Sequence, residues 1–167
     1  ADYPEALTVH RIDMSTSGLL VFARSKEAQR RLAIQFEKGV IAKSYIADVW
    51  GTSVPGSGTI DLPLGQDWPN RPRQKVDHDA GKPSQTKYET IGTHDHGVRL
   101  ALTPLTGRTH QLRLHLAAIG HPILGDDIYA HAEAMAAAAR LHLHATRLEL
   151  IHPTSNERLQ FESACPF

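Results

Sequence analysis

The residues best suited to chemistry lie near the start of the sequence, in the stretch "HRIDMSTSGLL". It places the guanidinium of Arg11 two positions before the carboxylate of Asp13, ahead of a Thr-Ser-Gly turn that leads into an apolar run. Asp13 is therefore expected at one end of a sheet, where loops commonly carry functional side chains. The alternative is that Asp13 only accepts hydrogen bonds from the backbone of its own turn, as aspartates in turns often do.

A second charged group lies inside a segment that is otherwise apolar. Residues 106–120 predict a buried helix, because apolar positions surround nearly the whole circumference. Arg113 lies in the middle of this segment, and a buried guanidinium without a partner is strongly destabilising. A carboxylate must therefore neutralise it. We expect Asp13 to be this partner, with Asp126 and Asp127 as the alternatives.

The pattern of apolar and turn-forming residues predicts the elements that position these groups. Residues 25–39 have a helix signature, with Ser25 as the N-cap and Gly39 as the stop. Because most strands follow one another through short turns, the expected fold class is α+β, with a mixed, largely antiparallel sheet and helices packed on it. The other predicted elements are a buried strand at 17–23, a strand at 43–51, a loop-rich stretch with one short strand at 51–72, a hairpin at 84–104, a short helix at 131–139, and two closing strands at 141–153 and 158–163.

Length and composition restrict the class of protein. The 167 residues, 1–167, are expected to form a single domain. No apolar run is long enough to cross a membrane, and the one cysteine, Cys165, excludes an internal disulfide and suits the reducing cytoplasm. The formal net charge is +0, yet Lys and Arg concentrate in residues 24–43 and 71–87. These two basic blocks either form one face for nucleic acid or are ordinary solvated surfaces.

Several stretches occur in the order and spacing of a known family. "HRIDMSTSGLL", "KSYIADVWG" and "GRTHQLRLHLAAIGHPILGD" closely resemble the RluA family of RNA pseudouridine synthases. "DWPNRPRQKV" and "GKPSQTKYE" resemble its branch with dual specificity for large-subunit ribosomal RNA and tRNA anticodon stem-loops. The resemblance implies the pseudouridine synthase fold and a cofactor-free isomerisation of uridine to pseudouridine in structured RNA. It also implies an additional amino-terminal strand with a Lys-Pro-x-Gly motif, so we expect an amino-terminal segment to be missing.

The resemblance implies a role for each matching residue. Asp13 corresponds to the catalytic aspartate, which either attacks C1′ of the ribose or removes a proton from C2′. Tyr45 corresponds to the tyrosine that stacks on the uracil and takes the C5 proton, and Arg113 to the arginine that pairs with the aspartate. Arg11 corresponds to the arginine that fills the gap in the RNA after the base flips out, and Leu143 to an aliphatic wall beside the base.

Basic and aromatic residues occur together in "DWPNRPRQK", a mixture typical of contacts with single-stranded or looped RNA. Trp68, Arg71, Arg73 and Lys75 are therefore expected to contact RNA, the alternative being a plain irregular loop. Arg108 lies in the first turn of the predicted buried helix, where free N–H groups and the helix dipole favour an anion such as phosphate. Structured RNA is thus the expected partner.

Two other functions fit parts of the sequence. A non-catalytic RNA-binding domain would keep the basic blocks without the chemistry. A glycoside or nucleoside hydrolase would use Asp13, but glycosidases generally need a second carboxylate, and none accompanies it in the matched stretches. The histidine pairs His94/His96, His110/His115 and His142/His144 are expected to be hydrogen-bonded within the protein or to lie at the surface, since no third metal ligand has a recognisable spacing. No metal and no cofactor are expected, and a monomer is the default.

Overall fold

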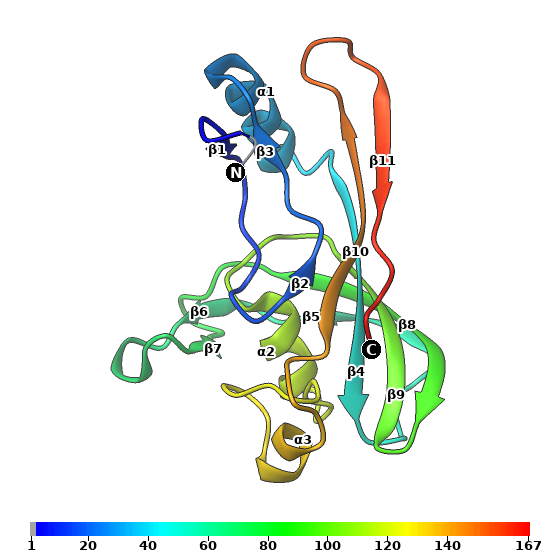
Figure 1. Cartoon of the computed structure of the whole chain (residues 1–167). Helices are drawn as coiled ribbons and strands as arrows, with labels where there is room; N and C mark the ends of the chain where they lie inside the picture. The colour runs from blue at the N-terminus through cyan, green and yellow to red at the C-terminus, as the bar shows by residue number, and fades with distance from the viewer. Residues whose placement is uncertain (1–2) are drawn as a thin grey trace.

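A mixed sheet forms the centre of the molecule. The computed structural model describes residues 3–167 and contains a seven-stranded sheet in the order β11-β10-β4-β9-β8-β5, with β2 paired to β10 beside this path (Figure 1). β2 pairs with β10 in parallel, and the other pairs of this sheet are antiparallel. The α+β prediction with a mixed, largely antiparallel sheet is confirmed. The strands are β2 (Ser17–Gly18), β4 (Ala42–Trp50), β5 (Ser57–Asp61), β8 (Gln85–His94), β9 (Gly97–Pro104), β10 (Leu143–Ile151) and β11 (Arg158–Glu162).

Two small sheets lie outside the main one. β1 (Leu7–Thr8) pairs with β3 (Phe22–Ala23), close to the first helix. β6 (Leu64–Gln66) pairs with β7 (Gln74–Val76), and a short 3-10 helix, η1 (Trp68–Asn70), lies in the connection between them. We call residues 64–76 the β6–β7 hairpin. It projects away from the main sheet, at the left of Figure 1.

Three helices complete the described chain: α1 (Lys26–Glu37), α2 (Gln111–Ala118) and α3 (Ala132–Ala136). The predicted N-cap of α1 is confirmed, because Ser25 Oγ accepts a hydrogen bond from the backbone N–H of Ala28 at 3.1 Å. The buried character predicted for the helix at 106–120 is confirmed for residues 111–116, but α2 begins only at Gln111, so Arg108 precedes the helix and does not lie in its first turn. None of the helices in residues 3–167 is both long and apolar enough to cross a membrane.

Two apolar clusters hold the helices on the sheet. In the first, Leu112 and Leu116 of α2 pack on the inner face of β4, β9 and the start of β10. In the second, Leu32 of α1 packs against Leu148 and Leu150, in the far half of β10. The register between β10 and β4 shifts in the middle of β10, where the two clusters meet. α2 consequently covers one half of the sheet face and α1 the other, as Figure 1 shows.

The predicted buried strand at residues 17–23 is wrong. This segment is divided between β2 and β3, and the side chains of Leu20 and Phe22 are 38% and 50% exposed. Gly18 has a φ of +109°, and the chain turns away from β10 after two paired residues and continues to β3, which pairs with β1. The apolar run therefore lines a connection between two sheets instead of a strand within one.

Candidate active site

Asp13 lies in a connection that is fixed at both ends. Before it, His10 Nε2 accepts a hydrogen bond from the backbone N–H of Val21 at 3.0 Å. After it, Ser17 Oγ lies 2.8 Å from Nδ1 of His144 in β10. The two anchors hold the intervening residues against the main sheet, and we call residues 10–17 the Asp13 loop.

Gly18 allows the Asp13 loop to approach β10 closely. A Cβ atom at this position would lie 2.2 Å from the carbonyl oxygen of Ala145, far inside van der Waals contact. The same carbonyl accepts a hydrogen bond from the backbone N–H of Leu19 at 3.0 Å. Any side chain at position 18 would therefore push the loop away from β10 and change the position of Asp13.

The carboxylate of Asp13 is partly exposed, and it has no hydrogen-bond or ion-pair partner within residues 3–167. Its negative charge nevertheless acts on the pKa values of three groups: Tyr45, His110 and Arg113. Coulombic interactions of this kind require short separations. The folded chain thus couples Asp13 electrostatically to Tyr45 and Arg113, which lie more than thirty positions from it in the sequence.

Tyr45 lies on β4, opposite Leu102 of β9 and Ala145 of β10. Burial, together with the nearby negative charge of Asp13, raises the pKa of the Tyr45 phenol to about 12. Both causes disfavour the phenolate. At physiological pH the side chain is consequently a neutral, largely buried aromatic ring beside the free carboxylate of Asp13.

The expected ion pair between Arg113 and Asp13 is wrong. Arg113 donates from Nε and Nη2 to Asp126 at 2.8 and 2.6 Å, and from Nη2 to Asp127 at 3.0 Å. The pKa of the Arg113 guanidinium is raised above its ordinary value. Burial acts to lower it, but the hydrogen bonds and charge of Asp126 outweigh burial, and the charge of Asp13 adds to their effect. The burial argument correctly required a carboxylate for Arg113 and selected the wrong one of three.

Asp126 can take this role because it is fully buried beside α2. Its Oδ1 also accepts hydrogen bonds from the backbone N–H groups of Ile128 and Tyr129, at 2.9 and 3.0 Å. Burial raises the pKa of the Asp126 carboxyl, but the hydrogen bonds and charge of Arg113 and these backbone donors hold it below its ordinary value. Asp126 therefore stays ionised while buried, and it leaves Asp13 free.

Sequence reasoning missed two residues near this cluster, His110 and Tyr129. His110 precedes α2 with φ 54° and ψ 18°, a left-handed conformation that is rare for a residue with a side chain. Its Nδ1 lies 2.9 Å from the hydroxyl of Tyr129. Burial lowers the pKa of His110, and the charge of Asp13 opposes this decrease. The available signal was the position of His110 inside "GRTHQLR"; nothing in the sequence singled out Tyr129.

Four of the residues expected to contact RNA present cations or an aromatic ring to the surface. Trp68 is 65% exposed, and the guanidinium of Arg71 lies 3.9 Å from the centre of its ring. Arg11 is exposed next to the candidate catalytic group. Arg108 is exposed as well, and its Nε donates to the carbonyl oxygen of Pro83 at 3.3 Å.

Arg73 and Lys75 also have partners within the protein. Arg73 donates to the carbonyl oxygen of Ile128, and its guanidinium lies 5.2 Å from the ring centre of Tyr129. Lys75 forms an ion pair with Asp77 at 3.1 Å. RNA contact by these two residues stays a prediction, and the contacts of Arg73 attach the β6–β7 hairpin to the segment that contains Ile128 and Tyr129.

Leu143 is 2% exposed and belongs to the apolar cluster against which Tyr45 packs. An aliphatic wall for a flipped base needs accessible surface, and this side chain presents almost none. Its predicted contact with the base would therefore require a movement of the neighbouring chain.

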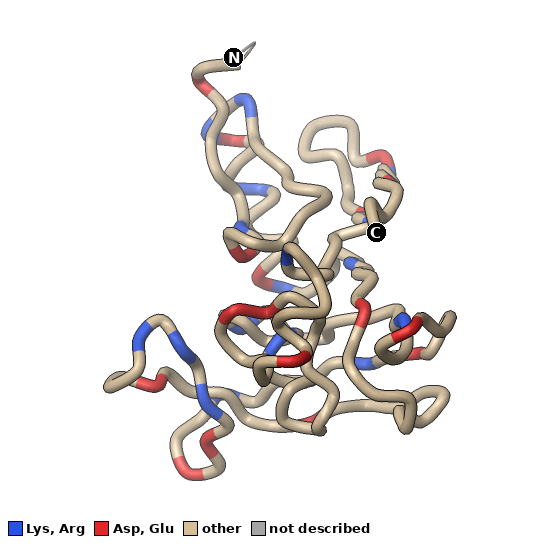
Figure 2. Tube along the Cα trace, turned by 60° about the horizontal axis from the view of Figure 1, so that its bottom comes forward, with Lys and Arg blue, Asp and Glu red and all other residues tan. Residues whose placement is uncertain are grey.

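Figure 2 shows one group of basic positions on the β6–β7 hairpin at the left and another along α1, with acidic positions between them and other basic positions elsewhere on the chain. A single continuous basic face is not visible in this view. The two groups are therefore separate candidates for RNA contact, and the hairpin carries the exposed ring of Trp68.

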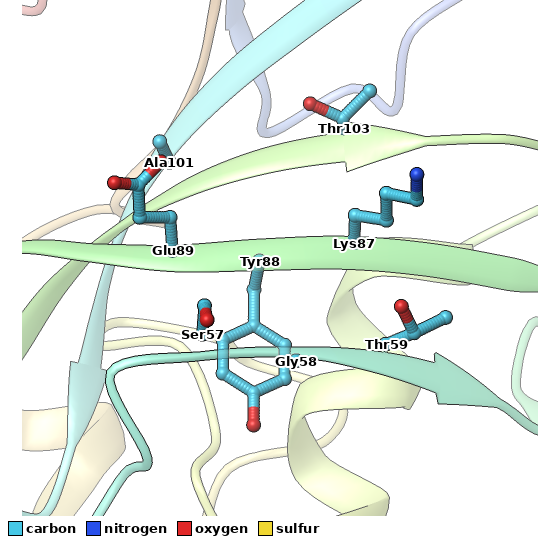
Figure 3. A pocket seen from close by; sticks show the side chains of 8 residues that line it. All are labelled: Ser57, Gly58, Thr59, Lys87, Tyr88, Glu89, Ala101 and Thr103. Atoms are coloured by element: carbon cyan, nitrogen blue, oxygen red, sulfur yellow. The ribbon is translucent and has the colours of Figure 1, made fainter.

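A shallow hollow of about 400 Å³ lies over β5, β8 and β9 (Figure 3). Tyr88 points to the side opposite Lys87 and Glu89, as alternation along β8 requires. The lining contains none of the residues predicted for the site, so this hollow is separate from the Asp13 cluster. The residues that line it are Ser57, Gly58, Thr59, Lys87, Tyr88, Glu89, Ala101 and Thr103.

The paired histidines have structural partners. His115 contacts Thr86 Oγ1 at 2.9 Å through Nδ1, and His142 contacts Asp48 Oδ2 at 3.0 Å through Nδ1. His144 contacts Ser17, as described for the Asp13 loop. Within the described range of 3–167, no group of three or more His, Cys, Asp or Glu side chains is arranged to hold a metal ion.

Comparison with known proteins gives consistent matches over the chain. The family described as RNA pseudouridylate synthase matches residues 1–118. The chain is 50% identical over 167 residues to the dual-specificity RNA pseudouridine synthase RluA of Escherichia coli O157:H7, covering 99% of this chain and 76% of that protein. It is 51% identical to the protein of the same name from Yersinia pestis, covering 99% of this chain and 81% of that one. The solved structure of human RNA pseudouridylate synthase domain containing 1 superposes with a TM-score of 0.88 at 30% identity, covering 99% of this chain and 71% of the human chain.

Proposed function

We propose that, since this chain belongs to the RNA pseudouridylate synthase family, Asp13 is the residue that starts its isomerisation of uridine to pseudouridine in RNA. In this reaction the N1–C1′ bond breaks, the uracil turns, and a C5–C1′ bond forms. C5 loses a proton and N1 gains one, so the atoms and electrons balance without an oxidant or reductant. The observation that carries the proposal is the unpaired carboxylate of Asp13, whose charge reaches Tyr45 and Arg113.

The carboxylate can act in either of two ways. It can bond to C1′ while the electrons of the N1–C1′ bond leave with the uracil, or it can remove the proton from C2′. Both routes need an ionised Asp13 with free lone pairs. Hydrogen bonds to a carboxylate make it less basic. Because Asp126 takes the hydrogen bonds of Arg113, the guanidinium supports the negative charge of Asp13 from nearby without occupying its oxygens.

Tyr45 is proposed to stack on the uracil. With a pKa of about 12, the phenol is neutral at physiological pH, so it offers an uncharged aromatic face in the resting enzyme. As an acceptor for the C5 proton, it would have to release its own proton in the same step. Stacking is therefore the role that the ground-state ionisation favours, and proton transfer requires a partner for the phenol proton.

The RNA is proposed to meet two parts of the surface. Extruding a base from a helix costs a few kcal/mol, and a guanidinium that fills the gap offsets part of this cost. Arg11 is suitably exposed two positions before Asp13. On the β6–β7 hairpin, Trp68 presents a ring on which an unpaired base can stack, and Arg71 presents a cation for an adjacent phosphate. Arg108 provides a further cation for a phosphate.

The substrate is proposed to be a stem-loop of ribosomal or transfer RNA. The support comes from the relatives, which are named dual-specificity RNA pseudouridine synthases and share about half of their residues with this chain. We further expect the protein to act as a monomer in the cytoplasm, where these RNAs are available. No other macromolecular partner is proposed.

The decisive experiment measures tritium release from RNA labelled at uracil C5. The wild-type protein is expected to release tritium and to leave pseudouridine in the RNA. Asp13→Asn keeps the shape of the side chain and removes its charge, so release is expected to vanish while RNA binding persists. Asp95→Asn, in the β8–β9 turn and away from the cluster, is the matched control and should behave as wild type.

Other outcomes would identify the alternatives. Tight RNA binding without release by the wild-type protein would favour a non-catalytic RNA-binding domain. Free uracil among the products would favour a hydrolase. Full activity of Asp13→Asn would refute the role of the carboxylate, whatever the overall reaction.

A further inference from the structure

Tyr129 joins two parts of the molecule that the proposed function uses separately. Its hydroxyl lies 2.8 Å from the backbone nitrogen of Gln74, at the start of β7, and 2.9 Å from Nδ1 of His110, immediately before α2. The N–H of Gln74 can only donate, so the phenol oxygen accepts this hydrogen bond, while the direction of its hydrogen bond with His110 Nδ1 depends on the tautomer of the imidazole. One hydroxyl therefore connects the β6–β7 hairpin with the residue in front of α2.

The turn that carries Tyr129 has further contacts on both sides. Towards the hairpin, Arg73 donates to the carbonyl oxygen of Ile128, and its guanidinium lies 5.2 Å from the ring centre of Tyr129. Towards α2, Asp126 binds Arg113, whose guanidinium lies 5.5 Å from the same ring. This turn is consequently fastened to the hairpin on one side and to the middle of α2 on the other.

His110 has a backbone conformation that needs support. The left-handed region costs a residue with a side chain about 1 to 2 kcal/mol, and His110 lies in it with φ 54°. Such an outlier persists only where neighbouring contacts hold it, and outliers of this kind cluster at functional sites. The side chain of His110 is held by Tyr129, and it lies within reach of the charges of Asp13 and Arg113.

We propose that the hydroxyl of Tyr129 is a positioning group that couples RNA contact by the β6–β7 hairpin to the placement of His110 and α2 beside Asp13. The inference rests on the proposed function, because it requires that the hairpin contacts RNA and that Asp13 performs the chemistry. RNA that stacks on Trp68 restrains the hairpin, and the hydroxyl transmits this restraint to the residue before α2. Tyr129 acts through His110 and is not itself catalytic.

Tyr129→Phe tests the proposal because it keeps the ring beside both guanidiniums and removes only the two hydrogen bonds. In single-turnover assays of tritium release at saturating RNA, the rate should fall about tenfold, while the RNA dissociation constant should change less than about twofold. Tyr88→Phe is the matched control, because the hydroxyl of Tyr88 makes no hydrogen bond in the described part of the chain. A wild-type rate for Tyr129→Phe would overturn the proposal.

A double-mutant cycle with Trp68→Ala separates coupling from a merely structural role. If Tyr129 couples the two regions, Trp68→Ala slows the single-turnover rate in the wild-type background and has little further effect on that rate in Tyr129→Phe. Rates that multiply independently, or a Trp68→Ala rate equal to wild type, would overturn the proposal. Asp13→Asn is assayed alongside, so a failure of the proposed function is recognised by its own result.

NMR measures two things in the same sample: the nitrogen signals of His110 report its tautomer, and the amide spectrum reports whether the protein is folded. In the wild-type protein the hydrogen bond with Tyr129 favours one tautomer of the neutral ring, with the proton on Nε2 if the hydroxyl donates to Nδ1 and on Nδ1 if the hydroxyl accepts from it. Tyr129→Phe should shift the Nδ1 and Nε2 signals towards a mixture of tautomers, while the amide spectrum stays that of the folded protein. Unchanged imidazole signals in the variant would contradict the proposed hydrogen bond.

Discussion

Gly18→Ala tests whether the close approach of the Asp13 loop to β10 positions the catalytic group. The added Cβ would lie 2.2 Å from the carbonyl oxygen of Ala145 and 2.7 Å from its nitrogen. These are backbone atoms inside a paired strand, so they cannot move aside as a flexible side chain would. The residue also has φ +109°, which side chains disfavour. The loop is therefore expected to detach from β10.

The magnitude follows from the contacts that detachment breaks. These are the hydrogen bond from the N–H of Leu19 to Ala145 and the contact between Ser17 Oγ and His144 Nδ1. At about 1 kcal/mol each, and with about 1 kcal/mol of backbone strain, the free energy of unfolding should fall by about 3 kcal/mol. Because a displacement of about 1 Å can lower catalysis about 100-fold, the single-turnover rate should fall at least that far.

Urea denaturation and tritium release measure the two effects. Gly39→Ala is the matched control, because Gly39 has φ +66° and nothing lies within 4 Å of the added Cβ. It should cost about 1 kcal/mol of backbone strain and leave the rate unchanged. If Gly18→Ala proved no more destabilising than Gly39→Ala and kept the wild-type rate, the steric argument for the Asp13 loop would be refuted.

Three further results are expected. Asp126→Asn removes the buried carboxylate that binds Arg113 and leaves the guanidinium only the exposed Asp127 as a charged partner, so urea denaturation should show a loss of about 3 to 5 kcal/mol, and a loss below about 1 kcal/mol would contradict the assigned ion pair. Burial lowers the pKa of His10 in the folded protein from 6.5 to about 4, so the unfolded chain takes up the proton first and stability should fall as pH decreases from 6.5 towards 4. His10→Gln should flatten this decrease, and an unaltered pH profile would exclude His10 as its source. Trp68→Ala should weaken RNA binding about tenfold at all salt concentrations. Arg71→Gln should make the slope of log RNA affinity against log salt concentration shallower by about 1, and a slope equal to that of the wild type would argue against a phosphate contact by Arg71.

The helices and strands whose signals lie in residues adjacent along the chain were predictable from the sequence. The helix at 25–39 has its N-cap and its glycine stop within its own residues, and the structure places α1 between them. The alternation at 43–51 and the short turn within 84–104 likewise indicate strands from adjacent residues alone, and β4, β8 and β9 form there. Membership of the pseudouridine synthase family was also readable, because its motifs are contiguous stretches.

The contacts between distant residues needed the tertiary structure. The sequence required a carboxylate for Arg113, yet only the fold decided that the buried Asp126 would be the partner and Asp13 would remain free. The strand predicted at 17–23 was lost for a related reason, since its pairing ends where Gly18 meets the backbone of β10. Periodicity and charge in the sequence indicate which residues must be buried or paired, because these needs follow from the residue itself. The tertiary structure decides which distant residue becomes the partner, because it alone brings the two together.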